Sequence, residues 1–223
     1  MSIAAWVAHR PSPACASIRG QGKPNIPRPR ILPVRESDCL VAELRGLDLR
    51  YVSTKFSDYT KTPFFQDPGP ATDEAWEALM AGMLIRVTAE ELSPANQSSI
   101  LLPQDSNQLA WLGVYHDLHC INTLRRWIHR DYYHPNLTGA EFNKFQAHTS
   151  HCLDMLRQTV QCHADAYLMT FRWTDSEPKP AFNPAMPRRT CVDFDLMRQS
   201  LKPRFVGLEE IQGLKNPLMN QGM

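Results

Sequence analysis

Residues 116–125 read HDLHCINTLR, and residues 148–157 read HTSHCLDMLR. Both segments follow the pattern His-x-x-His-Cys-(Ile/Leu)-(Asn/Asp)-x-Leu-Arg, and 32 residues separate their first histidines. Identical residues at fixed offsets, with histidine and cysteine among them, rarely recur by chance within one short chain. Two copies are too few for a solenoid, so we expect a pair of helices that face each other with approximate two-fold symmetry.

The two histidines of each motif are spaced to share one helix face. Residues three apart lie roughly 60° apart around a helix axis and point the same way. If the two faces meet, four imidazoles surround one point, and imidazole is a ligand that suits copper, zinc, iron and nickel. The alternative is four ordinary polar residues on exposed faces. The matched pairs favour a metal site with the ligands His116, His119, His148 and His151.

Each motif also carries a cysteine directly after its second histidine. Cys120 and Cys152 lie near the histidine face, and three interpretations stay open: thiolate ligands, a disulfide between the two helices, or small buried side chains. Cys162 lies roughly 15–20 Å further along its helix, at ~1.5 Å per residue. We therefore interpret Cys162 as a structural disulfide candidate with Cys191.

Two arginines end the motifs and fall on the opposite side of each helix from its first histidine. We expect Arg125 and Arg157 to pair with carboxylates such as Asp154. Three further histidines have no matched partner, and we expect them to be surface residues: His129, His134 and His163.

The rest of the chain predicts irregular segments around this helical pair. Eighteen prolines punctuate the 223 residues, and we expect residues 1–38 to form a Pro-rich, poorly ordered arm. Residues 39–200 form the expected metal-binding domain and residues 201–223 an irregular tail. Within the domain, the motif helices are expected at about 114–131 and 144–168. The predicted fold class is mainly α: two antiparallel motif helices in a small helical core, with short strands and long Pro-rich irregular arms.

Local signals predict four smaller elements. A helix is expected to start with a cap at Thr72, a short strand at 83–87, and a capping box at Thr88 ahead of a brief helix. The stretch CVDFDLMRQS, residues 191–200, predicts a short helix.

Composition excludes several classes of protein. The net charge is +1, which argues against a strongly basic nucleic-acid binder, so we expect no nucleic-acid partner. We find neither the G-x-G-x-x-G fingerprint of dinucleotide binding nor the G-x-S-x-G element of hydrolases. No stretch approaches the ~18 apolar residues of a membrane span, and the N-terminus has no clear signal peptide.

The paired motifs, within VYHDLHCINTLRRWIHRDYY and HTSHCLDMLRQTVQCHAD, resemble the UstYa-like oxidases of fungal secondary-metabolite clusters. The resemblance extends upstream to ATDEAWEALM and downstream to TCVDFD, over about residues 65–200. Many relatives carry a histidine two residues before the cysteine of the C-terminal motif, where this chain has Arg189. Members usually begin with one transmembrane helix, which this sequence does not show. The resemblance also points to the lumen of the secretory pathway.

The resemblance implies a copper-dependent, oxygen-using enzyme of mycotoxin biosynthesis, with zinc or iron as alternative metals. Such enzymes perform dehydrogenation, hydroxylation, cyclisation or halogenation on peptide and related scaffolds, often as pairs of homologous proteins. The expected partners are therefore a small-molecule or peptide substrate and a second family member, as a homo- or heterodimer. Two alternative functions are a non-redox metal-dependent cyclase and an accessory subunit of a homologous oxidase.

Overall fold

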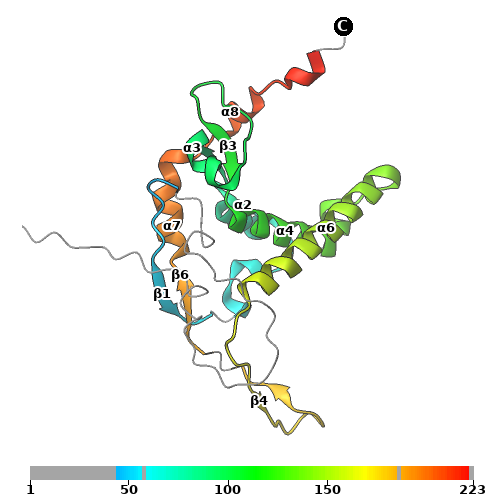
Figure 1. Ribbon diagram of the computed structural model, residues 1–223. Coiled ribbons are helices and arrows are strands. Elements are labelled where there is room, and N and C mark those ends of the chain that lie inside the picture. Colours follow the sequence, from blue (N-terminus) through cyan, green and yellow to red (C-terminus); the bar gives the residue numbers. More distant parts are fainter. Residues whose placement is uncertain (1–43, 57–58, 185–186, 221–223) are drawn as a thin grey trace, which may run out of the picture.

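Helices dominate the structure, a computed structural model that describes residues 44–56, 59–184 and 187–220 (Figure 1). The α-helices are α2 (Pro70–Met80), α3 (Ala89–Leu92), α4 (Gly113–Ile128), α5 (Arg130–Tyr133), α6 (Gly139–His163), α7 (Phe194–Leu201) and α8 (Leu208–Gln212). The 3-10 helices are η3 (Tyr59–Lys61), η4 (Pro63–Phe65), η5 (Ser93–Ala95), η6 (Lys202–Arg204) and η7 (Pro217–Asn220). The strands are β1 (Tyr51–Thr54), β2 (Leu84–Val87), β3 (Gln108–Trp111), β4 (Phe171–Arg172), β5 (Ala181–Phe182) and β6 (Arg189–Val192). The predicted mainly-α fold class is confirmed.

The two motif helices, α4 and α6, lie side by side and make the most extensive contact between any two elements (Figure 1). Small side chains fill the line between them: Cys120 and Thr123 of α4, and Thr149 and Cys152 of α6, are all buried. These positions repeat at helical spacing, so each helix buries one narrow stripe. Because small residues let two backbones approach closely, the neighbouring histidine positions are also brought close together.

Aromatic rings close the end of this hairpin where the chain turns from α4 into α6. The ring centre of Trp127 lies 5.4 Å from that of Phe142 and 5.5 Å from that of Phe145. His134, in the connector, packs edge-on against Phe145 at 4.7 Å. The connector is thereby folded onto the hairpin, and α5 occupies the last residues of the longer helix predicted for 114–131.

The second motif helix is displaced from its predicted range of 144–168. It begins at Gly139 and ends at His163, where Ala164 adopts a positive φ of 28°. The next residue, Asp165, does not continue the helix. Its carboxylate accepts a hydrogen bond from the backbone N–H of Tyr167 and pairs with Arg189 of β6. These contacts redirect the chain toward β6, so the helix stops about one turn earlier than its composition predicted.

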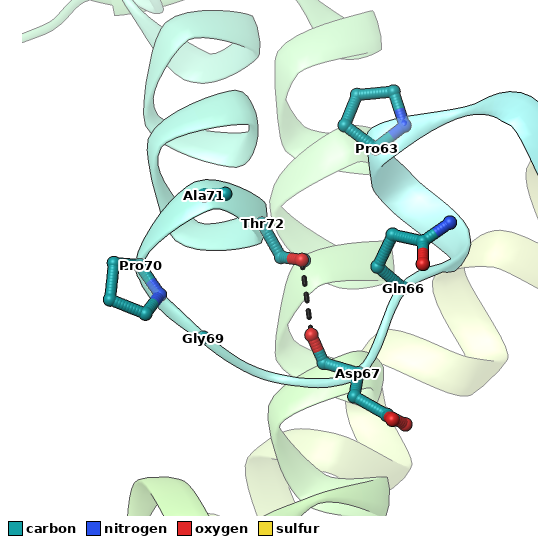
Figure 2. A pocket seen from close by; sticks show the side chains of 7 residues that line it. All are labelled: Pro63, Gln66, Asp67, Gly69, Pro70, Ala71 and Thr72. Atoms are coloured by element: carbon teal, nitrogen blue, oxygen red, sulfur yellow. Dashed lines mark hydrogen bonds between the residues drawn. The ribbon is translucent and has the colours of Figure 1, made fainter.

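Helix α2 packs on the opposite side of α4 through a half-buried polar cluster. Arg125 and the Tyr133 hydroxyl both donate to Asp73 Oδ1, each at 2.6 Å, and the Arg125 guanidinium lies over the Trp76 ring. The helix begins at Pro70, which suits the first helical position because proline lacks a backbone N–H. Thr72 does not cap it; its hydroxyl donates to the Asp67 carbonyl at 3.1 Å, as Figure 2 shows.

The remaining elements frame the helical pair with two-stranded sheets. Strands β2 and β3 are antiparallel, and β3 leads directly into α4. Strands β1 and β6 pair in the same way, and β6 leads into α7. The short strand predicted at 83–87 and the capping box at Thr88 are both confirmed. The predicted short helix is α7. A second apolar core lies under these elements and includes Ile85, Val87, Leu102, Met197, Leu201 and Val206.

The C-terminal region is more regular than predicted. Residues 201–223 were expected to be irregular, but η6, α8 and η7 lie within them. Arg204 of η6 explains part of this order, because its guanidinium donates to both carboxylate oxygens of Glu91 at 2.6 and 2.9 Å. The expected arm at 1–38 lies outside the described residues. Among the described helices, none is both long and apolar enough to cross a membrane.

Candidate metal centre

The four motif histidines form one cluster across the α4–α6 interface. Within each helix, the two ring centres are 6.4 Å apart in α4 and 6.5 Å apart in α6. Across the interface, His119 lies 5.5 Å from His148 and His116 lies 6.2 Å from His151. The later histidine of one helix thus pairs with the earlier one of the other, which confirms that the two helices are antiparallel.

The donor set fits a metal ion. Potential ligand atoms of His119, His148 and Cys152 all lie within 4.8 Å of one another. Nitrogen ligands in a tetrahedral shell at the metal–nitrogen distance of about 2.0–2.1 Å are roughly 3.4 Å apart. Rotation of the exposed His148 ring would close this difference, whereas His116 and His151, whose ring centres are 6.2 Å apart, do not belong to this closest group of three.

Burial differs between the two sides of the cluster. His116 and His119 of α4 are half-buried, whereas His148 and His151 of α6 are exposed. Burial lowers the pKa of His119, and the neighbouring His148 and His116 lower it further. The His119 imidazole is therefore neutral at neutral pH, which is the form that binds metals. The cluster is accessible from the α6 side.

The motif cysteines are buried next to the histidines as free thiols. Cys120 and Cys152 are both fully buried. Burial raises the pKa of Cys120 to about 12, together with a hydrogen bond to Cys152 and the nearby negative charge of Asp117. Cys120 thus stays protonated at neutral pH. The structure shows no disulfide between Cys120 and Cys152. Cys152 lies close enough to His119 and His148 to act as a metal ligand.

The second cysteine pair is not linked either. Cys162 is an exposed free thiol near the end of α6, and Cys191 is a half-buried free thiol on β6. Pairing with β1, in which Cys191 lies opposite Val52, fixes the position of Cys191. The structure does not show the predicted Cys162–Cys191 bond.

The unmatched histidines and the motif arginines do not join the cluster. His134 packs on Phe145, and the exposed His163 donates from Nδ1 to the Thr159 carbonyl. Arg157 pairs with Asp154 at 2.8 Å, as predicted, and Arg125 pairs with Asp73. Both arginines therefore stabilise the fold, and neither contributes to the histidine cluster.

Arg189 contacts one acidic and two aromatic side chains. It pairs with Asp165, and its guanidinium lies over the rings of Phe56 at 4.4 Å and Tyr167 at 5.5 Å. The side chain thereby fastens the segment after α6 to β6.

Sequence reasoning missed one neighbour of the cluster. The indole of Trp111, the last residue of β3, lies 5.7 Å from the His119 ring and 6.4 Å from the His116 ring. Its only sequence signal was its place in the apolar run LAWLGV ahead of the first motif. By contrast, the pocket drawn in Figure 2 is formed by the loop before α2 and contains none of the four histidines.

Fold and site together define a small helical protein with a candidate metal centre built from two antiparallel helices. The chain belongs to the family described as mycotoxin biosynthesis protein UstYa, whose sequence model matches residues 26–200. No solved structure matches the chain.

Curated relatives carry names that describe oxidative enzymes. The chain is 27% identical to the UstYa family oxidase phomYc of Diaporthe leptostromiformis, over 60% of this chain and 56% of the relative. It is 36% identical to the UstYa family oxidase VicYb of Bipolaris victoriae, over 41% of this chain and 76% of the relative. It is 31% identical to the hydroxylase cctR of Talaromyces islandicus, over 46% and 40%. The chain spans about half the length of the first relatives it matches.

Proposed function

We propose that this chain is a copper-dependent oxidase of fungal secondary-metabolite biosynthesis that uses dioxygen to modify a peptide or related scaffold. The reaction would be a dehydrogenation, hydroxylation or cyclisation. The observation that carries the proposal is the meeting of four imidazoles from two antiparallel helices, in a chain whose relatives are named oxidases and a hydroxylase.

The ligand types favour copper among the metals that imidazole binds. For a given set of nitrogen ligands, affinity among divalent first-row metals is highest for copper. His116, His119, His148 and His151 would hold the ion, with the Cys152 thiol as a fifth candidate. Bound copper supplies one-electron redox chemistry and reaction with dioxygen. Zinc and iron remain alternatives for the same donors.

Side chains of α4 and α6 fix the positions of the imidazoles and leave the site accessible to a substrate. The buried stripe of Cys120, Thr123, Thr149 and Cys152 fixes the separation of the helices, and hence the separation of the imidazoles. The half-buried α4 histidines are held by the protein core, whereas the exposed α6 histidines leave one side open to a substrate. The neutral state of His119 keeps the site ready for metal at neutral pH.

A homologous partner is part of the proposal. Apolar side chains are exposed on the two motif helices, with Ile128 73%, Leu153 60% and Val160 70% exposed. Of these, Leu153 and Val160 lie seven residues apart on one face of α6, where a partner would cover them. We propose a homo- or heterodimer with a family member. Placement in the lumen of the secretory pathway rests on the family resemblance alone.

Metal loading tests the proposal. The purified chain is loaded with copper or zinc, and metal content, the copper electron-spin-resonance spectrum and dioxygen uptake with a candidate scaffold are measured. Copper bound through nitrogen, with product formed only when dioxygen is present, supports the oxidase. Product formed anaerobically with zinc would identify a non-redox cyclase instead. Activity that appears only on co-expression with a homologue would identify an accessory subunit.

A further inference from the structure

Trp111 occupies a fixed position beside the histidine cluster. It ends β3, where it lies opposite Leu84 of β2, and α4 begins two residues later at Gly113. The backbone on both sides of Trp111 is therefore held by regular structure. Its indole reaches both histidines of α4, with ring centres 5.7 and 6.4 Å away.

Trp111 is much more exposed than Trp76, a tryptophan of the core. Trp76 is only 6% exposed and packs under Arg125, whereas Trp111 keeps 40% of its surface exposed. One side of the indole contacts the imidazoles and another part faces solvent. Leaving a large apolar ring exposed has a cost in free energy, which binding of an apolar ligand removes.

We propose that Trp111 is the substrate-positioning residue of this site, against which an uncharged aromatic ring of the substrate packs. The inference rests on the proposed function of the same site. Indole recognises other rings by offset or edge-to-face packing, with ring centres about 4.5–7 Å apart. A substrate ring held on the exposed part of Trp111 would lie beside His116 and His119, and so beside a metal held by the cluster.

The one acidic side chain of α4, the helix that follows Trp111, already has a partner. Asp117, on the same helix, accepts a hydrogen bond from the Thr159 hydroxyl of α6 at 3.0 Å and is thereby engaged across the interface. An aromatic group without charge would lose little hydration on binding here.

Binding of small ring probes to the full chain tests the role of Trp111. The probes are N-acetyltyrosinamide and, as a control without a ring, N-acetylleucinamide. Binding is measured by NMR titration of the metal-free and the copper-loaded protein. We expect Trp111→Ala to weaken binding of the tyrosine probe about 3- to 10-fold, and Trp111→Phe to keep it within about 2-fold. Trp173→Ala, which removes a tryptophan that is 75% exposed, should change nothing.

Copper titration of the same variants separates positioning from support of the metal site. Trp111→Phe and Trp111→Leu should bind copper like the parent protein, while Trp111→Leu loses the preference for the tyrosine probe. Trp111→Leu keeps an apolar side chain in the strand. If Trp111→Ala does not fold, Trp111→Leu therefore still tests whether the indole ring binds the tyrosine probe.

Two results would overturn the proposal. One is tyrosine-probe binding by Trp111→Leu equal to that of the parent. The other is a loss of copper in Trp111→Phe as large as in a histidine variant, because Trp111 would then only support the cluster. If the parent protein binds no copper, the proposed oxidase fails, but probe binding by the metal-free protein still decides the role of Trp111.

Discussion

Replacing His148 with alanine should strongly weaken metal binding while leaving the fold intact. The His148 ring lies 5.5 Å from that of His119 and 6.5 Å from that of His151, so it is central to the cluster. It is also exposed, in the middle of α6. Few interactions other than those with the cluster are therefore lost.

The two effects differ greatly in expected size. A four-ligand site binds a metal such as zinc with about 10–16 kcal/mol, or roughly 3 kcal/mol per ligand. Loss of one ligand should weaken metal binding roughly 100-fold, at 1.4 kcal/mol per tenfold change. The free energy of unfolding of the metal-free protein should change by only about 0.5 kcal/mol, as for other exposed positions.

Isothermal titration with copper and thermal unfolding of the metal-free protein measure the two effects separately. His163→Ala is the matched control, because His163 is exposed on the same helix and its Nδ1 donates to the Thr159 carbonyl one turn away within α6. The control should keep parental copper affinity. Oxidative activity should follow metal content, with His148→Ala losing most of it.

The reasoning would be refuted by His148→Ala binding copper as tightly as the parent. Equal loss of copper in His148→Ala and His163→Ala would also refute it, because the effect would then reflect general destabilisation of α6. Full activity in a variant that lacks both His148 and His151 would end the metal-site interpretation altogether.

Three further predictions concern stability and thiol chemistry. Burial alone would raise the pKa of Glu91, but hydrogen bonds and a nearby guanidinium lower it from 4.5 to about 2. Its stabilisation, about 3 kcal/mol, should be complete above pH 4.5 and lost as the pH falls toward 2, and acid unfolding of Glu91→Gln should lack this step. Alkylation without reductant should label Cys162 readily and Cys191 more slowly, and recovery of a disulfide-linked peptide would contradict their free state. Gly82→Ala should lower the free energy of unfolding by about 2–4 kcal/mol, because φ is +81° and the new Cβ would lie 2.2 Å from an aromatic carbon. Gly113→Ala, which meets nothing within 4 Å, should be neutral in the same denaturant titration.

Local patterns in the sequence predicted the parts of the site that depend on neighbours along the chain. A spacing of three residues places His116 and His119 on one helix face, and the same holds for the second motif. The capping box at Thr88 and the ion pair between Arg157 and Asp154 are also short-range features, three residues apart, and both are present. Each could be predicted because helix geometry alone fixes the positions of the side chains.

The ends of the elements were harder to predict because they depend on contacts with distant residues. Helix α6 ends at His163 because Asp165 pairs with Arg189, 24 residues further along the chain. The expected Cys162–Cys191 bond, which the structure does not show, also depends on distant segments. Periodicity could place Cys162 on its helix, but only the pairing of β1 with β6 fixes where Cys191 lies.

The sequence by itself determined that four imidazoles are available on two matching helix faces. Only the tertiary structure decided which of them meet: His119 with His148, and His116 with His151, with the α6 pair left exposed. It also brought Trp111 to the cluster from the end of a strand. Helical periodicity acts over a few residues and can be read along the chain, whereas helix pairing, burial and the position of β3 arise from packing between segments far apart in sequence.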